Sequence, residues 1–196
     1  LNIPKLFPLC GIYETADHKE IEQNYGKAVQ AMYPIKGKRT RHYAFYDELD
    51  IKQLSEDRLM EDVFEDALKN GEFQLWYQPK VDPVTGNILG AEALIRWKRP
   101  DGTMLSPGKF IPLFEKNGNI TTLDEYVFRT VCAQQQRWLQ AGAKLYPISV
   151  NISRVSLYYS NVVDKYREIL NSFRLDPKYV PLEITESATI DNSDIS

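Results

Sequence analysis

The stretch that decides the fold is "GAEALIRWKRP", residues 90–100, where two charged side chains interrupt an apolar strand pattern. Ala, Leu, Ile and Trp surround Glu92 and Arg96, as in a strand that is buried in a protein core. Burying a carboxylate is costly unless it is paired with a cation or bound to a metal ion. Glu92 therefore requires a partner from elsewhere in the chain.

Around this stretch the sequence alternates between strand and helix patterns. The segment "FQLWYQPKV" (73–81), the turn 82–87 and "ILGAEALIRWK" (88–98) predict an antiparallel hairpin. The periodicity that follows predicts helices over 106–118, 123–142 and 155–175, and apolar strands over 146–153 and 179–187. Apolar strands that alternate with helices indicate parallel βα units with both faces of the sheet covered.

Three of the predicted strands share one anomaly, an oxygen-bearing side chain in an apolar run. These are Glu92 in "ILGAEALI", Asn151 in "ISVNIS" and Glu183 in "VPLEIT". In a parallel βα barrel the functional groups gather at the carboxyl ends of several strands. Two carboxylates and an amide oxygen there suit a hard cation such as Mg²⁺ or Mn²⁺. Structural ion pairs, Glu92 with Arg96 and Glu183 with a lysine, remain the alternative.

Two further polar residues belong to the same region. Arg96 offers a rigid fork of donors for a phosphate, and Gln78 offers an amide for a base or a sugar. The structural alternatives are a strand-end ion pair for Arg96 and a half-exposed hairpin residue for Gln78. Neither residue identifies a ligand by itself.

The sequence before residue 58 has a different organisation. Residues 1–47 show a strand–helix–strand pattern that is too short to bury a core of its own. Residues 48–57 are polar and are predicted to form a linker. We therefore expect the end of one domain over 1–47 and the beginning of a second over 58–196.

Composition limits the classes of partner. The chain has 196 residues, 43% of them hydrophobic, and a formal net charge of −3, which gives no general affinity for DNA, RNA or anionic membranes. The basic cluster at 36–41 is interpreted as a solvated turn, and no apolar run approaches the length of a membrane span. Cys10 and Cys132 lie in apolar surroundings and are expected to be buried, reduced thiols of a cytoplasmic protein.

The motifs together resemble a known family. "YQPKVDPVTGNILGAEALIRW" resembles the opening of the EAL domain, the bacterial cyclic di-GMP phosphodiesterase, with Glu92-Ala93-Leu94 as the signature tripeptide. "FIPLFEKNG", "ISVNIS" and "LEITES" resemble the next motifs of that family in the same order. The segment from "CGIYETAD" to "HYAFYDE" resembles the last strand–helix–strand of a GGDEF domain, the diguanylate cyclase type.

The resemblance implies a fold and a reaction. The fold is the N-terminal half of a (β/α)₈ barrel, preceded by a short α+β piece of a GGDEF-like domain. The reaction is the opening of cyclic di-GMP to linear pGpG with two divalent cations, Mg²⁺ or Mn²⁺. Carried over by motif, the metal ligands are Glu92, Asn151 and Glu183. The dinucleotide contacts are Gln78, Leu94 and Arg96, and Glu186 is a supporting residue for an active-site loop.

The family pattern continues beyond this chain. Its paired aspartates and catalytic lysine are expected after Ser196, and a barrel of this type needs eight strands and about 250 residues. We therefore expect a fragment without activity of its own from a homodimeric parent, cytoplasmic or anchored through upstream domains. The alternative is a catalytically inactive EAL domain that senses cyclic di-GMP or mediates protein contacts.

Overall fold

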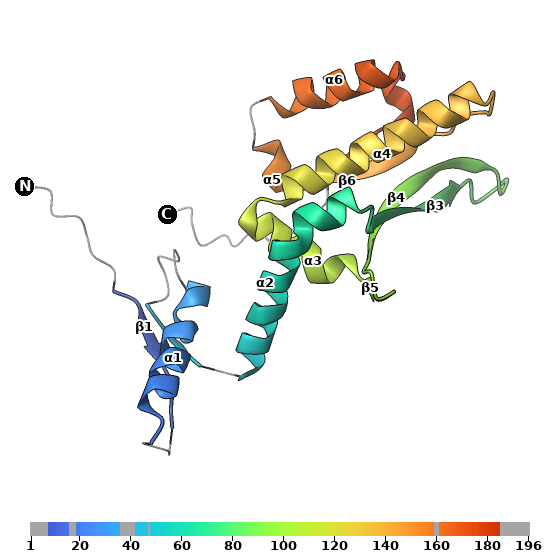
Figure 1. Ribbon diagram of the computed structural model, residues 1–196. Coiled ribbons are helices and arrows are strands. Elements are labelled where there is room, and N and C mark those ends of the chain that lie inside the picture. Colours follow the sequence, from blue (N-terminus) through green and yellow to red (C-terminus); the bar gives the residue numbers. More distant parts are fainter. Residues whose placement is uncertain (1–7, 16–18, 36–41, 47, 159–160, 185–196) are drawn as a thin grey trace, which may run out of the picture. The chain divides into compact units, whose positions relative to one another are not determined.

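The chain divides into two units, one over residues 1–62 and one over 63–196. In the computed structural model of the protein, the described residues are 8–15, 19–35, 42–46, 48–158 and 161–184 (Figure 1). The basic cluster at 36–41 and Glu186 lie outside these residues, so the predictions made for them stay predictions. No helix in the described ranges is long and apolar enough to cross a membrane.

The first unit has the predicted strand–helix–strand order. Strands β1 (Cys10–Ile12) and β2 (Tyr43–Phe45) pair in parallel, with α1 (Ile21–Ala31) and the 3₁₀ turn η1 (Tyr33–Ile35) between them in the chain. Gly11 lets the helix pack closely, because a Cβ there would lie 1.7 Å from the carbonyl oxygen of Ala28. Cys10 is exposed, so the expectation of a buried thiol is wrong there: it neighbours Gly11 in the strand, so its side chain points away from the face on which α1 packs.

Helix α2 (Glu48–Lys69) contains the segment that was expected to be a linker. Its polar sequence suits an exposed helix as well as a loop, because Glu, Lys, Gln and Leu are good helix formers. Phe64 and Ala67 in its last turns are buried, and Gly71 ends it with a positive φ of 69°, which glycine adopts readily. The domain limits themselves stay predictions.

The second unit is built on a sheet with the order β3-β4-β6-β7, and β5 pairs with the far end of β4. Its strands are β3 (Phe73–Val81), β4 (Ile88–Lys98), β5 (Met104–Leu105), β6 (Ile148–Ile152) and β7 (Leu182–Ile184). β3 runs antiparallel to β4, while β4, β6 and β7 are parallel. The predicted hairpin is therefore confirmed, including its strand bounds.

Four helices and a 3₁₀ turn connect these strands. They are α3 (Pro107–Asn117), α4 (Ile120–Gln140), α5 (Arg154–Leu157), α6 (Val162–Phe173) and η2 (Pro177–Tyr179). The expected helix over 155–175 is interrupted, because α5 has four residues and α6 begins at Val162. Ser153 caps α5 by accepting a hydrogen bond from the Val155 backbone N–H at 3.2 Å.

One face of the sheet carries the core of this unit. Ala93, Val150 and Ile152 are buried there against α4 and α6, which lie on the same side of the sheet (Figure 1). Cys132 of α4 is part of this core, and burial raises the pKa of its thiol to about 12, so the expected reduced, unreactive thiol fits this position. The helices thus leave the opposite face of the sheet for polar side chains.

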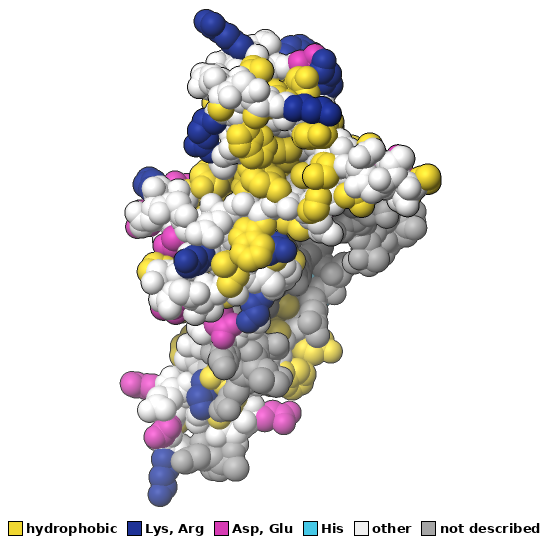
Figure 2. All heavy atoms as spheres, turned by 90° about the vertical axis from the view of Figure 1, so that its right-hand side faces the viewer, with side chains coloured by type: hydrophobic (Ala, Val, Ile, Leu, Met, Phe, Trp, Pro, Cys, Tyr) yellow, Lys and Arg dark blue, Asp and Glu magenta, His cyan; other side chains and the backbone are white. Residues whose placement is uncertain are grey.

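A cluster of aromatic rings closes the end of the sheet beside α2 and α3. Its members are Phe64, Phe73, Trp97, Phe110 and Phe114. All five are at most 2% exposed. The far end of the hairpin differs, because it bears the exposed apolar side chains of Val81, Val84, Ile88 and Leu89. Figure 2 views the molecule from this side, where hydrophobic side chains gather on the surface.

Candidate functional site

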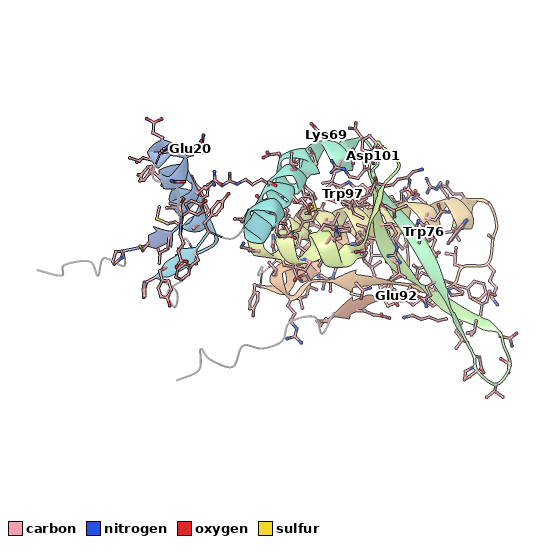
Figure 3. The ribbon with its side chains drawn as sticks, turned by 90° about the horizontal axis from the view of Figure 1, so that it is seen from below. Glu20, Lys69, Trp76, Glu92, Trp97 and Asp101 are labelled. Carbon is pink, nitrogen blue, oxygen red and sulfur yellow. The ribbon has the colours of Figure 1, made fainter. Side chains whose placement is uncertain are left out.

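The register of the sheet brings the predicted site residues to one face. Gln78 lies opposite Glu92, Glu92 lies opposite Ser149, and Asn151 lies opposite Glu183. Cross-strand partners share a face, and so do residues two apart in a strand. The predicted ligands on β4, β6 and β7 therefore stand side by side, on the face that α4 and α6 do not cover. Figure 3 shows Trp76, Glu92 and Trp97 along the β3–β4 hairpin.

The partner of Glu92 is an amide on the neighbouring strand. The Nδ2 of Asn151 donates a hydrogen bond to Oε1 of Glu92 at 2.7 Å. Arg96 instead donates to the carbonyl oxygen of Ile95 at 2.8 Å, and its guanidinium carbon lies 6.0 Å from the centre of the Trp76 ring. In the described part of the chain, Glu92 and Arg96 form no ion pair, so Arg96 keeps donors for another ligand.

Glu183 forms an ion pair with a residue that the sequence interpretation did not single out. The ammonium of Lys80 donates to Oε1 of Glu183 and, at 2.9 Å, to Oγ of Ser149. The hydrogen bond from Lys80 lowers the pKa of the Glu183 carboxyl. The alternative in which a lysine pairs with Glu183 is thus present in the structure. The pair is about half exposed, so its net contribution to stability is small, about 0–1 kcal/mol.

These side chains fit a hard divalent cation by their chemistry. Glu92 and Glu183 contribute carboxylate oxygens, and Asn151 uses its Nδ2 on Glu92, which does not consume its amide oxygen. Mg²⁺ and Mn²⁺ prefer such oxygen ligands. Among the described residues no group of three His, Cys, Asp or Glu could hold a metal ion, so the proposed set depends on the amide of Asn151.

A cavity of about 140 Å³ opens beside the site, between the ends of β4 and β6 and the helices α3 and α4. Most of its walls are apolar, and its polar lining comes from Arg96, Asp124 and Asn151. Leu94, one of the expected dinucleotide contacts, also lines it, whereas Gln78 is not among its lining residues. The cavity therefore joins Asn151 of the proposed metal site to Arg96, the proposed phosphate contact.

Two acidic residues that the sequence interpretation missed hold the turn after Asn151. Asp124 of α4 accepts hydrogen bonds from the Ser153 backbone N–H at 2.9 Å and from Oγ of Ser156 at 2.6 Å. Glu115 of α3 accepts one from Oγ of Ser153 at 2.6 Å. Asp124 is 7% exposed, and burial raises the pKa of its carboxyl to about 6. A single acid in an amphipathic helix carries no sequence signal for such a contact.

The raised pKa of Asp124 predicts a pH-dependent stability. Because the folded state binds this proton more tightly than the unfolded state, the free energy of unfolding falls as the pH rises from 3.8 to about 6. Asp124→Asn removes this contribution. The free energy of unfolding of the variant, relative to that of the wild type, should therefore be higher at pH 7 than at pH 4 by up to about 3 kcal/mol, as measured by urea unfolding.

Asp176→Asn is the control for this measurement. Backbone and side-chain hydrogen bonds from Lys178 lower the pKa of the exposed Asp176 carboxyl. A lowered pKa contributes stability that is lost only as the pH falls below 3.8, so the difference between this variant and the wild type should stay nearly constant between the same two pH values. A difference between Asp124→Asn and the wild type that does not vary with pH would contradict the prediction.

Gly90 allows close contact between β4 and the segment before β6. A Cβ at this position would lie 2.6 Å from the carbonyl oxygen of Pro147, which accepts the Ala91 backbone N–H at 2.9 Å. We expect Gly90→Ala to lower the free energy of unfolding by about 1–3 kcal/mol, because the strands must separate to admit the methyl group. Gly108→Ala, in open space on α3, should cost nothing by the same measurement; equal effects would contradict the argument.

Comparisons with known proteins identify the family. A sequence model of the EAL domain matches residues 61–195. The chain belongs to the EAL domain family. The bifunctional diguanylate cyclase/cyclic di-GMP phosphodiesterase MucR of Pseudomonas aeruginosa is 34% identical over 167 residues, 85% of this chain and 24% of that protein. The cyclic di-GMP phosphodiesterase NbdA of the same species is 29% identical over 178 residues, 91% of this chain and 23% of that protein.

Solved EAL structures share the fold. The complex described as PaMucR phosphodiesterase with c-di-GMP matches with a TM-score of 0.61 and 35% identity, covering 69% of this chain and 55% of that chain. The expected fold class is thereby confirmed as an α/β chain that forms part of an EAL-type (β/α)₈ barrel. The chain spans about a quarter of the length of MucR and NbdA. The EAL match begins at residue 61, so the GGDEF resemblance of residues 1–47 stays a prediction.

Proposed function

We propose that the EAL domain to which this chain contributes hydrolyses cyclic di-GMP to linear pGpG with the help of Mg²⁺ or Mn²⁺. The observation that carries the proposal is the contact between Glu92 and Asn151 on adjacent parallel strands, beside a cavity that Arg96 also lines. Divalent cations at such a site would polarise the phosphoryl oxygen and supply hydroxide near neutral pH. Similarity to named cyclic di-GMP phosphodiesterases supports this choice of substrate.

The residues of this chain would bind and orient the reactants. Glu92, Asn151 and Glu183 would hold the cation through their oxygens, and Arg96 would bind a phosphate with its guanidinium. Leu94 would pack against the dinucleotide, and Gln78 would contact a base or a sugar. Glu186, outside the described residues, would support a neighbouring loop. The proposal also includes a cytoplasmic location and a homodimer formed through the EAL domain.

An assay of the full-length protein tests this proposal. Cyclic di-GMP would be incubated with the protein and either Mg²⁺ or Mn²⁺, and chromatography would follow the formation of pGpG. Calorimetry with EDTA present would measure binding without turnover. Hydrolysis that requires the metal is the expected result. Binding without hydrolysis would favour an inactive sensor domain, and the absence of both would overturn the assignment.

A further inference from the structure

We propose that Lys80 is a positioning residue that holds Glu183 in the orientation needed to bind a cation. The proposal rests on the function proposed above, because Glu183 acts there as a metal ligand. The protonated side chain of Lys80 carries no acceptor atom, so it cannot bind a metal ion itself. Lys80 would therefore act only through the groups that it contacts.

The contacts of Lys80 span the sheet. Lys80 lies on β3, whereas its partners Ser149 and Glu183 lie on β6 and β7. Because β4 lies between β3 and β6, the lysine side chain must pass over β4 to reach them. Neighbouring strands are about 4.8 Å apart, so this path uses most of the length of a lysine side chain.

Two small residues, Gly90 and Ser149, lie along this path. Gly90 lies directly opposite Lys80 on β4, and paired residues of an antiparallel ladder stand on the same face. A side chain at position 90 would project from this same face, and its Cβ would lie 2.6 Å from the carbonyl oxygen of Pro147. Ser149 on β6 is short, 2% exposed, and offers a hydroxyl oxygen to the ammonium. Lys80, Gly90 and Ser149 thus lie on one face of three neighbouring strands.

The two carboxylate oxygens of Glu183 would have separate roles. Lys80 donates to Oε1 of Glu183 and also to Oγ of Ser149, which holds the ammonium in place. With Oε1 held by Lys80, Oε2 is the carboxylate oxygen that would bind the cation. Residues that hold a metal ligand in place typically contribute about 10–100-fold to metal affinity.

Isothermal titration of the 196-residue chain with MnCl₂ tests the proposal. Lys80→Met should weaken Mn²⁺ binding about tenfold, and Lys80→Arg should retain it within about threefold, because arginine keeps the charge and the donors. Lys178→Met is the matched control, since it breaks an ion pair with Asp176 at 3.0 Å without touching Glu183. Unchanged or tighter binding by Lys80→Met would overturn the positioning role.

A second measurement does not depend on the metal. In EDTA, the thermal midpoints of the wild type, Lys80→Met, Glu183→Gln and the double variant would be compared. The shift of the double variant should differ from the sum of the two single shifts by about 1–3 °C. If the wild type bound no Mn²⁺, the metal assignment would fail, and this cycle alone would decide whether Lys80 holds Glu183. Additive shifts would refute the contact and the role derived from it.

Discussion

Glu92→Gln in the full-length protein is expected to lower the hydrolysis of cyclic di-GMP by more than about 100-fold. Loss of a group that only supports a metal ligand costs about 10–100-fold, and Glu92 is proposed to be a ligand itself. Glutamine keeps the volume of the side chain and can still accept the hydrogen bond that Asn151 donates to Oε1. It removes the negative charge, so the fold should remain while affinity for the cation falls.

Two readouts separate this effect from misfolding. The rate of pGpG formation would be measured across a range of Mn²⁺ concentrations, together with the thermal midpoint of each protein. Glu65→Gln, on the exposed face of α2, is the control and should retain wild-type activity and metal dependence. Near-normal turnover by Glu92→Gln would remove Glu92 from the proposed metal site.

Trp97→Ala is expected to lower the free energy of unfolding by about 3–5 kcal/mol. The Trp97 side chain is fully buried, and the centre of its ring lies 4.7 Å from that of Phe73 and 5.6 Å from that of Phe110. Its Nε1 also donates to Oε2 of Glu72 at 2.9 Å. The substitution would therefore open a cavity and leave the carboxylate of Glu72 without this donor.

Trp76→Ala on the same hairpin is the matched control, because Trp76 is 56% exposed and faces the opposite side of the sheet. Its loss should cost less than about 1 kcal/mol in urea unfolding. If Trp97→Ala cost as little as Trp76→Ala, the aromatic cluster would contribute little to the stability of the EAL unit.

Local periodicity predicted the hairpin correctly. The strands 73–81 and 88–98 appear with the bounds expected from alternating side chains and a turn rich in Asp, Pro, Gly and Asn. The start of α3 at Pro107 and its end at Gly118 were also expected, because proline suits a first turn and Gly118 adopts a φ of 86°. These features depend on neighbouring residues and are therefore visible in the sequence.

Features that depend on distant contacts were missed. The predicted helix over 155–175 is divided into α5 and α6, and Ser153 and Ser156 at α5 donate to Glu115 and Asp124, on two helices that precede them in the chain. The polar residues 48–57 join a helix whose last turns bury Phe64. Periodicity within a segment cannot report a hydrogen bond or a packing contact made by another segment.

The candidate site also combines residues that the sequence identifies with contacts that only the structure reveals. Glu92, Asn151 and Glu183 stood out by themselves, because a polar side chain in an apolar strand is unusual and needs a partner. Their assignment as ligands stays a prediction, but the structure places them on one face of adjacent strands. Lys80 did not stand out, because a lysine near a strand end resembles an ordinary solvent-exposed residue.

By itself, the sequence determined the family, the hairpin, the parallel βα order and the unusual acids, since each follows from residue types at short spacing. Only the tertiary structure decided which groups meet. It paired Glu92 with Asn151 rather than with Arg96, and it brought Lys80 across Gly90 to Glu183. Strand order and register set these pairs, because they bring residues that are up to 103 positions apart within hydrogen-bonding distance.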